Sequence, residues 1–178
     1  MKLLRTIRLD PSDTFVFEKA AEPGEWAVPG AFAFAHDEIA TLAGKARAAF
    51  RSGFLAIDSL GWSTLVQVVE ASEEQRLAAI ELLAERLVEH FGAPDLAAAR
   101  PAAEEEIAFA ASLSDHPKGM LAAVSRKYED GAIRESFRTL IPSIGPKPLR
   151  AYAFLEVVGE DEPDEHVDLR TLGKGGQG

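Results

Sequence analysis

The dipeptide Asp130-Gly131 constrains the fold of this chain most strongly, because it lies between two runs of alternating polar and apolar residues, 120–129 and 132–141. An Asp-Gly pair in this setting is the strongest short-range signal for a β-hairpin with a two-residue turn. Such a turn fixes the strand register and therefore predicts which side chains face each other. The expected cross-strand pairs are Tyr128 with Ile133, Arg126 with Glu135, and Val124 with Phe137.

A second clear signal lies at Ser72 and Gln75, which have the spacing of a helix capping box. Apolar residues follow at helical spacing, and Gly92 is placed to end the helix. The expected buried stripe of this helix is Leu77, Ile80, Ala84, Leu87, Val88 and Phe91.

The other elements are predicted from apolar periodicity and from turn-forming residues. A helix is expected to open at His36-Asp37 and to end at Gly53 with a left-handed cap, and another to run from Pro101, at its first position, to about Leu113. The expected strands are 3–9, 14–18, one or two within 25–35, 54–57, 63–70, the two hairpin strands, and 149–158.

Runs of neighbouring strands with segregated helices indicate an α+β fold with a mostly antiparallel sheet and about three helices. The length of 178 residues fits a single domain, which we expect to cover 1–158. Beyond it the composition becomes acidic and then glycine-rich, so 159–178 is predicted to be a flexible tail.

The formal net charge is −10, which argues against a nucleic-acid partner or an anionic membrane surface. The chain has no cysteine, so disulfides, thiolate nucleophiles and cysteine metal sites are excluded. Charged residues interrupt the first ten positions, and no apolar stretch approaches the roughly 20 residues that span a bilayer. We therefore expect a cytoplasmic location.

No motif assigns a catalytic residue, a metal site or a cofactor. His36, His90, His116 and His166 lack the spacing of a helical metal pair, and the serines lie in no GxSxG context. The acidic run 104–106 is interpreted as favourable charge near the amino end of a helix.

One feature points to a ligand. In the predicted register Lys127, Arg134 and Arg138 lie on the same face of the hairpin as Ser125 and Ser136. A basic face that also carries hydroxyls can hold an anion such as a carboxylate or a phosphate-bearing cofactor. The alternative is a solvated outer face whose charges prevent edge-to-edge pairing.

The segments MKLLRTIRLDPSDTFVFEKAAEPGEWAVPGAF and FRSGFLAIDSLGWSTLVQVVEAS resemble a family of uncharacterised proteobacterial proteins of similar length. The resemblance covers the folded part of the chain. It implies a bacterial cytoplasmic accessory protein and transfers no functional residue.

The sequence leaves the biochemical function unknown, and we expect a non-enzymatic accessory role with another protein as partner. The alternative is a small-molecule or anionic-cofactor-binding protein, or an enzyme, that uses the basic face of the 120–141 hairpin.

Overall fold

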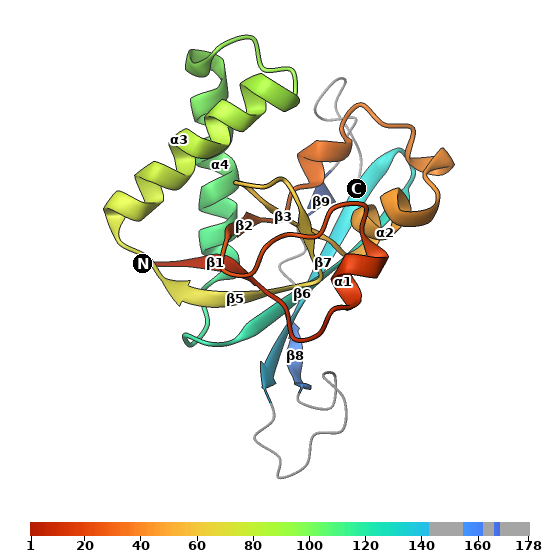
Figure 1. Cartoon of the computed structure of the whole chain (residues 1–178), viewed down its shortest axis with the longest axis vertical. Helices are drawn as coiled ribbons and strands as arrows, with labels where there is room; N and C mark the ends of the chain where they lie inside the picture. Colours follow the sequence, from red (N-terminus) through yellow and green to blue (C-terminus); the bar gives the residue numbers. More distant parts are fainter. Residues whose placement is uncertain (143–154, 162–165, 168–178) are drawn as a thin grey trace.

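The structure is a computed structural model of the chain, and it describes residues 1–142, 155–161 and 166–167. In the view of Figure 1, α3 and α4 lie side by side at the upper left and α1 and α2 at the right, around a single central sheet. The elements are β1 (Lys2–Ile7), α1 (Ser12–Val16), β2 (Trp26–Val28), η1 (Ala31–Phe34), η2 (Ile39–Thr41), α2 (Gly44–Ser52), β3 (Phe54–Ala56), β4 (Trp62–Ser63), β5 (Leu65–Glu70), α3 (Glu73–His90), α4 (Leu96–Leu113), β6 (Leu121–Glu129), β7 (Ala132–Pro142), β8 (Leu155–Asp161) and β9 (His166–Val167), where η marks a 3-10 helix.

The strands are ordered β4-β3-β2-β1-β5-β6-β7-β8, with β9 also paired to β7, and every ladder between these strands is antiparallel. Only Thr64 separates β4 from β5, yet β4 pairs with β3 while β5 pairs with β1. Residues 62–70 are therefore one bent segment, whose first part pairs with β3 and whose second part pairs with β1. The sheet must curl to allow both pairings. This confirms the expected single-domain α+β fold with an antiparallel sheet.

The hairpin prediction is confirmed in its register. Tyr128 pairs with Ile133, Arg126 with Glu135 and Val124 with Phe137. Both turn residues have positive φ, 54° at Asp130 and 76° at Gly131, as a two-residue hairpin turn requires.

The helix after Ser72 is also confirmed. The Ser72 hydroxyl accepts a hydrogen bond from the Gln75 N–H at 3.1 Å, and the Gln75 side chain accepts one from the Ser72 N–H at 2.9 Å. Ile80, Ala84 and Leu87 are buried as expected. The prediction that Leu77 belongs to the buried stripe is wrong, because Leu77 is 49% exposed. The fully buried Leu83 packs in the core instead.

The helix expected to begin at Pro101 begins earlier. Asp95 is its N-cap and accepts a hydrogen bond from the Ala98 N–H at 2.8 Å, so α4 runs from Leu96 and Pro101 lies inside it. Glu104 to Glu106 are therefore in the middle of α4. Their interpretation as charge near the helix amino end was wrong.

Three predictions in the first 53 residues were also wrong. Residues 14–18 form no strand, because Asp13 turns into the structure, accepts hydrogen bonds from the N–H and hydroxyl of Thr64, and anchors α1. The segment after Pro29 forms η1 rather than a strand. The expected helix begins at Gly44, not at His36, since Leu42 and Ala43 are extended, and its terminal Gly53 has φ of −98° instead of a left-handed conformation.

At the carboxyl end, β8 overlaps the predicted strand 149–158 from Leu155 onward and continues to Asp161. Both β8 and β9 pair with β7. Positions 149–154 of that predicted strand lie outside the described residues, as do 162–165 and 168–178 of the predicted tail.

The main core lies between the sheet and the α3–α4 pair, and a smaller one around Phe17, Phe34, Phe50 and Ile133 lies on the α2 side. Within the described ranges, no helix is long and apolar enough to cross a membrane.

Candidate functional site

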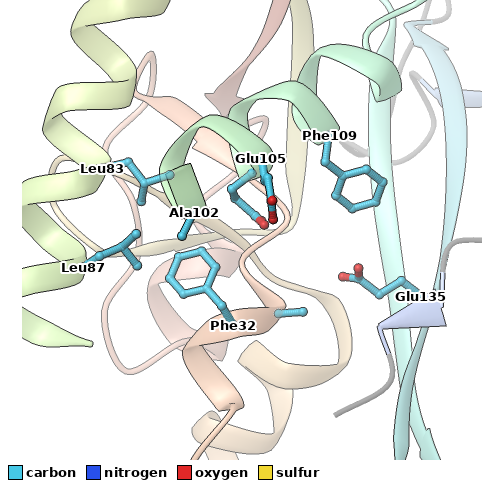
Figure 2. A pocket seen from close by; sticks show the side chains of 9 residues that line it. Phe32, Leu83, Leu87, Ala102, Glu105, Phe109 and Glu135 are labelled. Atoms are coloured by element: carbon cyan, nitrogen blue, oxygen red, sulfur yellow. The ribbon is translucent and has the colours of Figure 1, made fainter. Parts of the chain in front are cut away.

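A pocket lies where η1, α3 and α4 meet the inner face of β7, and it has a volume of about 240 Å³. Its wall is mainly apolar, but three carboxyl-bearing residues, Glu105, Glu106 and Glu135, also line it. Figure 2 shows the Glu135 carboxyl directed from β7 across the pocket toward the side chains of α4. The lining residues are Ala31, Phe32, Leu83, Leu87, Ala102, Glu105, Glu106, Phe109 and Glu135.

Glu135 is held in the pocket by a buried ion pair. The Arg126 Nε donates to Glu135 Oε2 at 2.6 Å, and both side chains are 0% exposed. The other carboxylate oxygen, Oε1, is buried and has no hydrogen-bond partner in the structure. Leaving a buried polar atom of this kind without a hydrogen bond costs free energy, so a donor bound at Oε1 would stabilise the site.

Arg126 is in turn fixed by backbone oxygens. Its Nη1 donates to the carbonyls of Gly53 at 2.8 Å and Phe50 at 3.0 Å, and its Nη2 donates to Pro29. A cation at the carboxyl end of α2 is favoured by the helix dipole. Nη2 keeps a second N–H, but none of the hydrogen bonds that Arg126 makes reaches Oε1 of Glu135.

Glu106 lies on the opposite wall, on α4. Its Oε1 accepts a hydrogen bond from the Gly30 N–H at 3.1 Å. Burial of the carboxyl raises the pKa of Glu106 to about 7; the negative charge of Glu135 adds to the rise, while the Gly30 hydrogen bond and Arg126 oppose it. A carboxyl with this pKa can donate or accept a proton near neutral pH.

Gly30 must be glycine for this arrangement. Its φ is 83°, and a Cβ added there would come within 2.6 Å of Leu55 Cβ. The left-handed residue turns the chain from β2 into η1 and directs its N–H at Glu106. The Pro29-Gly30 break seen in the sequence thus positions one carboxyl of the pocket.

Aromatic rings fix the apolar wall. Phe32 packs edge-on against Phe91 with ring centroids 5.2 Å apart, and Phe109 packs edge-on against Phe137 at 5.8 Å. Ala102 and Glu105 are exposed at the pocket mouth, whereas Leu83 is fully buried at its back.

The residues proposed from sequence lie elsewhere. Lys127 pairs with Arg134 across the hairpin and Ser125 with Ser136, so they share the predicted face, and Arg138 lies on it opposite Ala123. Lys127 and Arg134 both approach Oε1 of Glu129, at 3.3 and 3.5 Å. None of the three lines the Glu106–Glu135 pocket. Their role in anion binding stays a prediction.

The comparison with known families has one result. The family model described as a family of unknown function (DUF6505) matches residues 1–150. The chain belongs to this family. No match emerges from the curated proteins, and none from the solved structures. Membership in the family therefore assigns no activity, and the pocket must be interpreted from its own chemistry.

Sequence reasoning missed Glu106, although helical spacing carries a signal for it. Ala99, Ala103, Ala110 and Leu113 are all buried, and Glu106 continues their alternating three- and four-residue spacing. Arg126 and Glu135 were correctly paired across the hairpin. Their burial follows only from the curl of the sheet, which places that face against α2 and α4.

Proposed function

We propose that the chain is a small-molecule-binding protein whose ligand has an apolar body and an N–H or O–H donor group. The ligand would occupy the Glu106–Glu135 pocket with its donor directed at Oε1 of Glu135. The observation that carries the proposal is that this buried oxygen lacks a partner at the end of a mainly apolar cavity. Ligand pockets commonly combine an apolar wall with a few placed polar groups.

The size of the cavity supports a ligand built on about one aromatic ring. A dry protein cavity of about 150 Å³ is known to bind benzene, so about 240 Å³ accommodates a ring with a short polar arm. Phe32 and Phe109 offer ring faces and edges to it. Glu106, protonated or ionised near neutral pH, can donate to or accept from a second polar atom of the same ligand.

The test uses three probes that differ only in the head group: 2-phenylethylamine, 2-phenylethanol and ethylbenzene. Binding is measured by NMR titration of labelled protein. We expect the amine and the alcohol to bind at the pocket at least tenfold more tightly than ethylbenzene. Equal binding of all three, or shifts away from α4 and η1, would overturn the proposal.

A variant separates loss of the pocket from loss of the fold. Ala102→Trp fills the mouth from an exposed position and leaves the polar groups in place, so it should abolish binding. Ala108→Trp is the matched control, because Ala108 is exposed on the same helix and does not line the pocket. Binding retained in Ala102→Trp would place the probe elsewhere.

A protein partner is a second candidate function, and it is favoured by an exposed apolar patch. Phe15 is 72% exposed on α1, and Val16, the next residue, and Leu9, which precedes α1, are each 39% exposed. Exposed aromatic residues are enriched in protein interfaces. In this role the chain would be a bacterial cytoplasmic accessory protein. Phe15→Asp should then remove a stoichiometric partner from native pull-downs, and an unchanged set of captured proteins would count against it.

A further inference from the structure

A second cavity lies between α2 and β6, and we call it the basic groove. Its volume is about 560 Å³. The residues that line it are Ile39, Ala40, Arg47, Phe50, Arg51, Ser125, Arg126, Lys127 and Tyr128. None of them is acidic, although the chain as a whole has a net charge of −10.

Two cations on the α2 wall of the groove have charge available for a ligand. Arg47 and Arg51 are exposed there, whereas the side chain of Lys127 lies on the outer hairpin face with Arg134 and Arg138. Within the described part of the chain, no ion pair involves Arg47 or Arg51. Lys127 has only an exposed contact with Glu129 at 3.3 Å, and such surface pairs are weak.

The placement of Arg47 and Arg51 is unfavourable in the absence of an anion. They are four residues apart in α2, so they lie on the same helix face, where like charges repel. An anion between the two guanidinium groups would convert this repulsion into attraction. Arginine is suited to this because its planar fork binds phosphate or carboxylate oxygens in pairs.

Arg126 makes the groove a rigid site. It lies on β6, is fully buried, and donates to the carbonyls of Ala49, Phe50 and Gly53 at the end of α2. These bonds tie the two walls together. They also place a positive charge on the carboxyl end of α2, which would otherwise repel an anion.

We propose that the basic groove binds a small organic phosphate, with the phosphate oxygens between Arg47 and Arg51 and the organic part against Ile39, Phe50 and Tyr128. Two guanidinium forks side by side match a group with several oxygens and more than one negative charge. A single planar carboxylate would engage one guanidinium fork. The volume lies in the range of 300–1,000 Å³ typical of ligand sites.

The experiment is an NMR titration of the full chain with inorganic pyrophosphate, at ionic strength held constant with sodium chloride. We expect saturable shifts confined to residues 39–51 and 125–128. Shifts that do not saturate, or that spread over the basic residues of the whole surface, would overturn the proposal. Citrate serves as the carboxylate probe and should bind at least fivefold more weakly; equal or tighter citrate binding would overturn the phosphate assignment.

Single-residue variants test whether Arg47 and Arg51 hold the phosphate. Arg47→Gln and Arg51→Gln should each weaken pyrophosphate binding at least tenfold, without lowering the melting temperature, because both side chains are exposed. Two single variants with the same loss of charge are controls: Lys45→Gln on the same helix and Arg138→Gln on the outer hairpin face, neither of which lines the groove. Each should change binding less than twofold. Loss of binding in Arg138→Gln with retention in Arg51→Gln would move the site to the outer hairpin face and reject the groove.

Discussion

Replacing Glu106 with glutamine should make the folded chain more stable at pH 8, because it removes a carboxylate whose negative charge is disfavoured by burial. The pKa of Glu106 is about 7 in the fold, compared with an ordinary value of 4.5. As the pH rises from 4.5 to 7, the unfolded chain releases the proton while the folded chain keeps it, so the free energy of unfolding falls. At about 1.4 kcal/mol per pKa unit, the full difference is about 3 kcal/mol.

The Glu106→Gln variant stays neutral at every pH and keeps an oxygen that can accept from Gly30. Its advantage over the unmodified chain should reach about 3 kcal/mol above pH 7 and vanish below about pH 4.5. Urea unfolding at pH 4, 5, 6, 7 and 8 measures this difference directly. The exposed neighbour Glu105→Gln is the control and should change the unfolding free energy by less than about 0.5 kcal/mol. A Glu106→Gln effect that is independent of pH, or that grows toward acid, would refute the reasoning.

Three further predictions concern stability in denaturant unfolding. Arg126→Met leaves Glu135 buried without its cation and should lose about 3–5 kcal/mol, whereas adding Glu135→Leu should restore most of it; a double variant as unstable as the single one would contradict this. Ile80→Ala removes a core side chain and should lose about 2–5 kcal/mol, while Leu77→Ala, at an exposed position, should lose less than about 0.5; comparable losses would mean the assigned helix face is wrong. Gly61→Ala would place a Cβ 2.6 Å from backbone atoms of Ala20 and Ala21 and should lose about 1–3 kcal/mol, so an unchanged midpoint would show that this contact is loose.

The parts of the fold that the sequence predicts correctly are those determined by neighbouring residues. The Asp130-Gly131 turn and the Ser72–Gln75 capping box each need only a few adjacent positions, and both agree with the structure in register and hydrogen bonds. The wrong predictions depend on distant contacts. Asp13 anchors α1 through Thr64, which is 51 positions away, so the apolar residues of 14–18 carried no information about this helix.

The candidate site follows the same division. The pairing of Arg126 with Glu135 was predictable because turn chemistry fixes it. That the pair is buried, and that it meets Glu106 and Gly30, depends on a sheet curl that no local pattern encodes. The anion-binding role of Lys127 stays a prediction, whereas Arg47 and Arg51 of the basic groove come from a helix nearly 80 positions away from the hairpin, which no local pattern connects to it.

The most direct test of the proposed ligand site is a crystal structure of the chain soaked with 2-phenylethylamine. The account predicts the ring between Phe32 and Phe109, and the ammonium nitrogen about 2.7–3.2 Å from Oε1 of Glu135. A pocket without the amine at a saturating concentration, or an Oε1 that already accepts a hydrogen bond from a protein group, would contradict it.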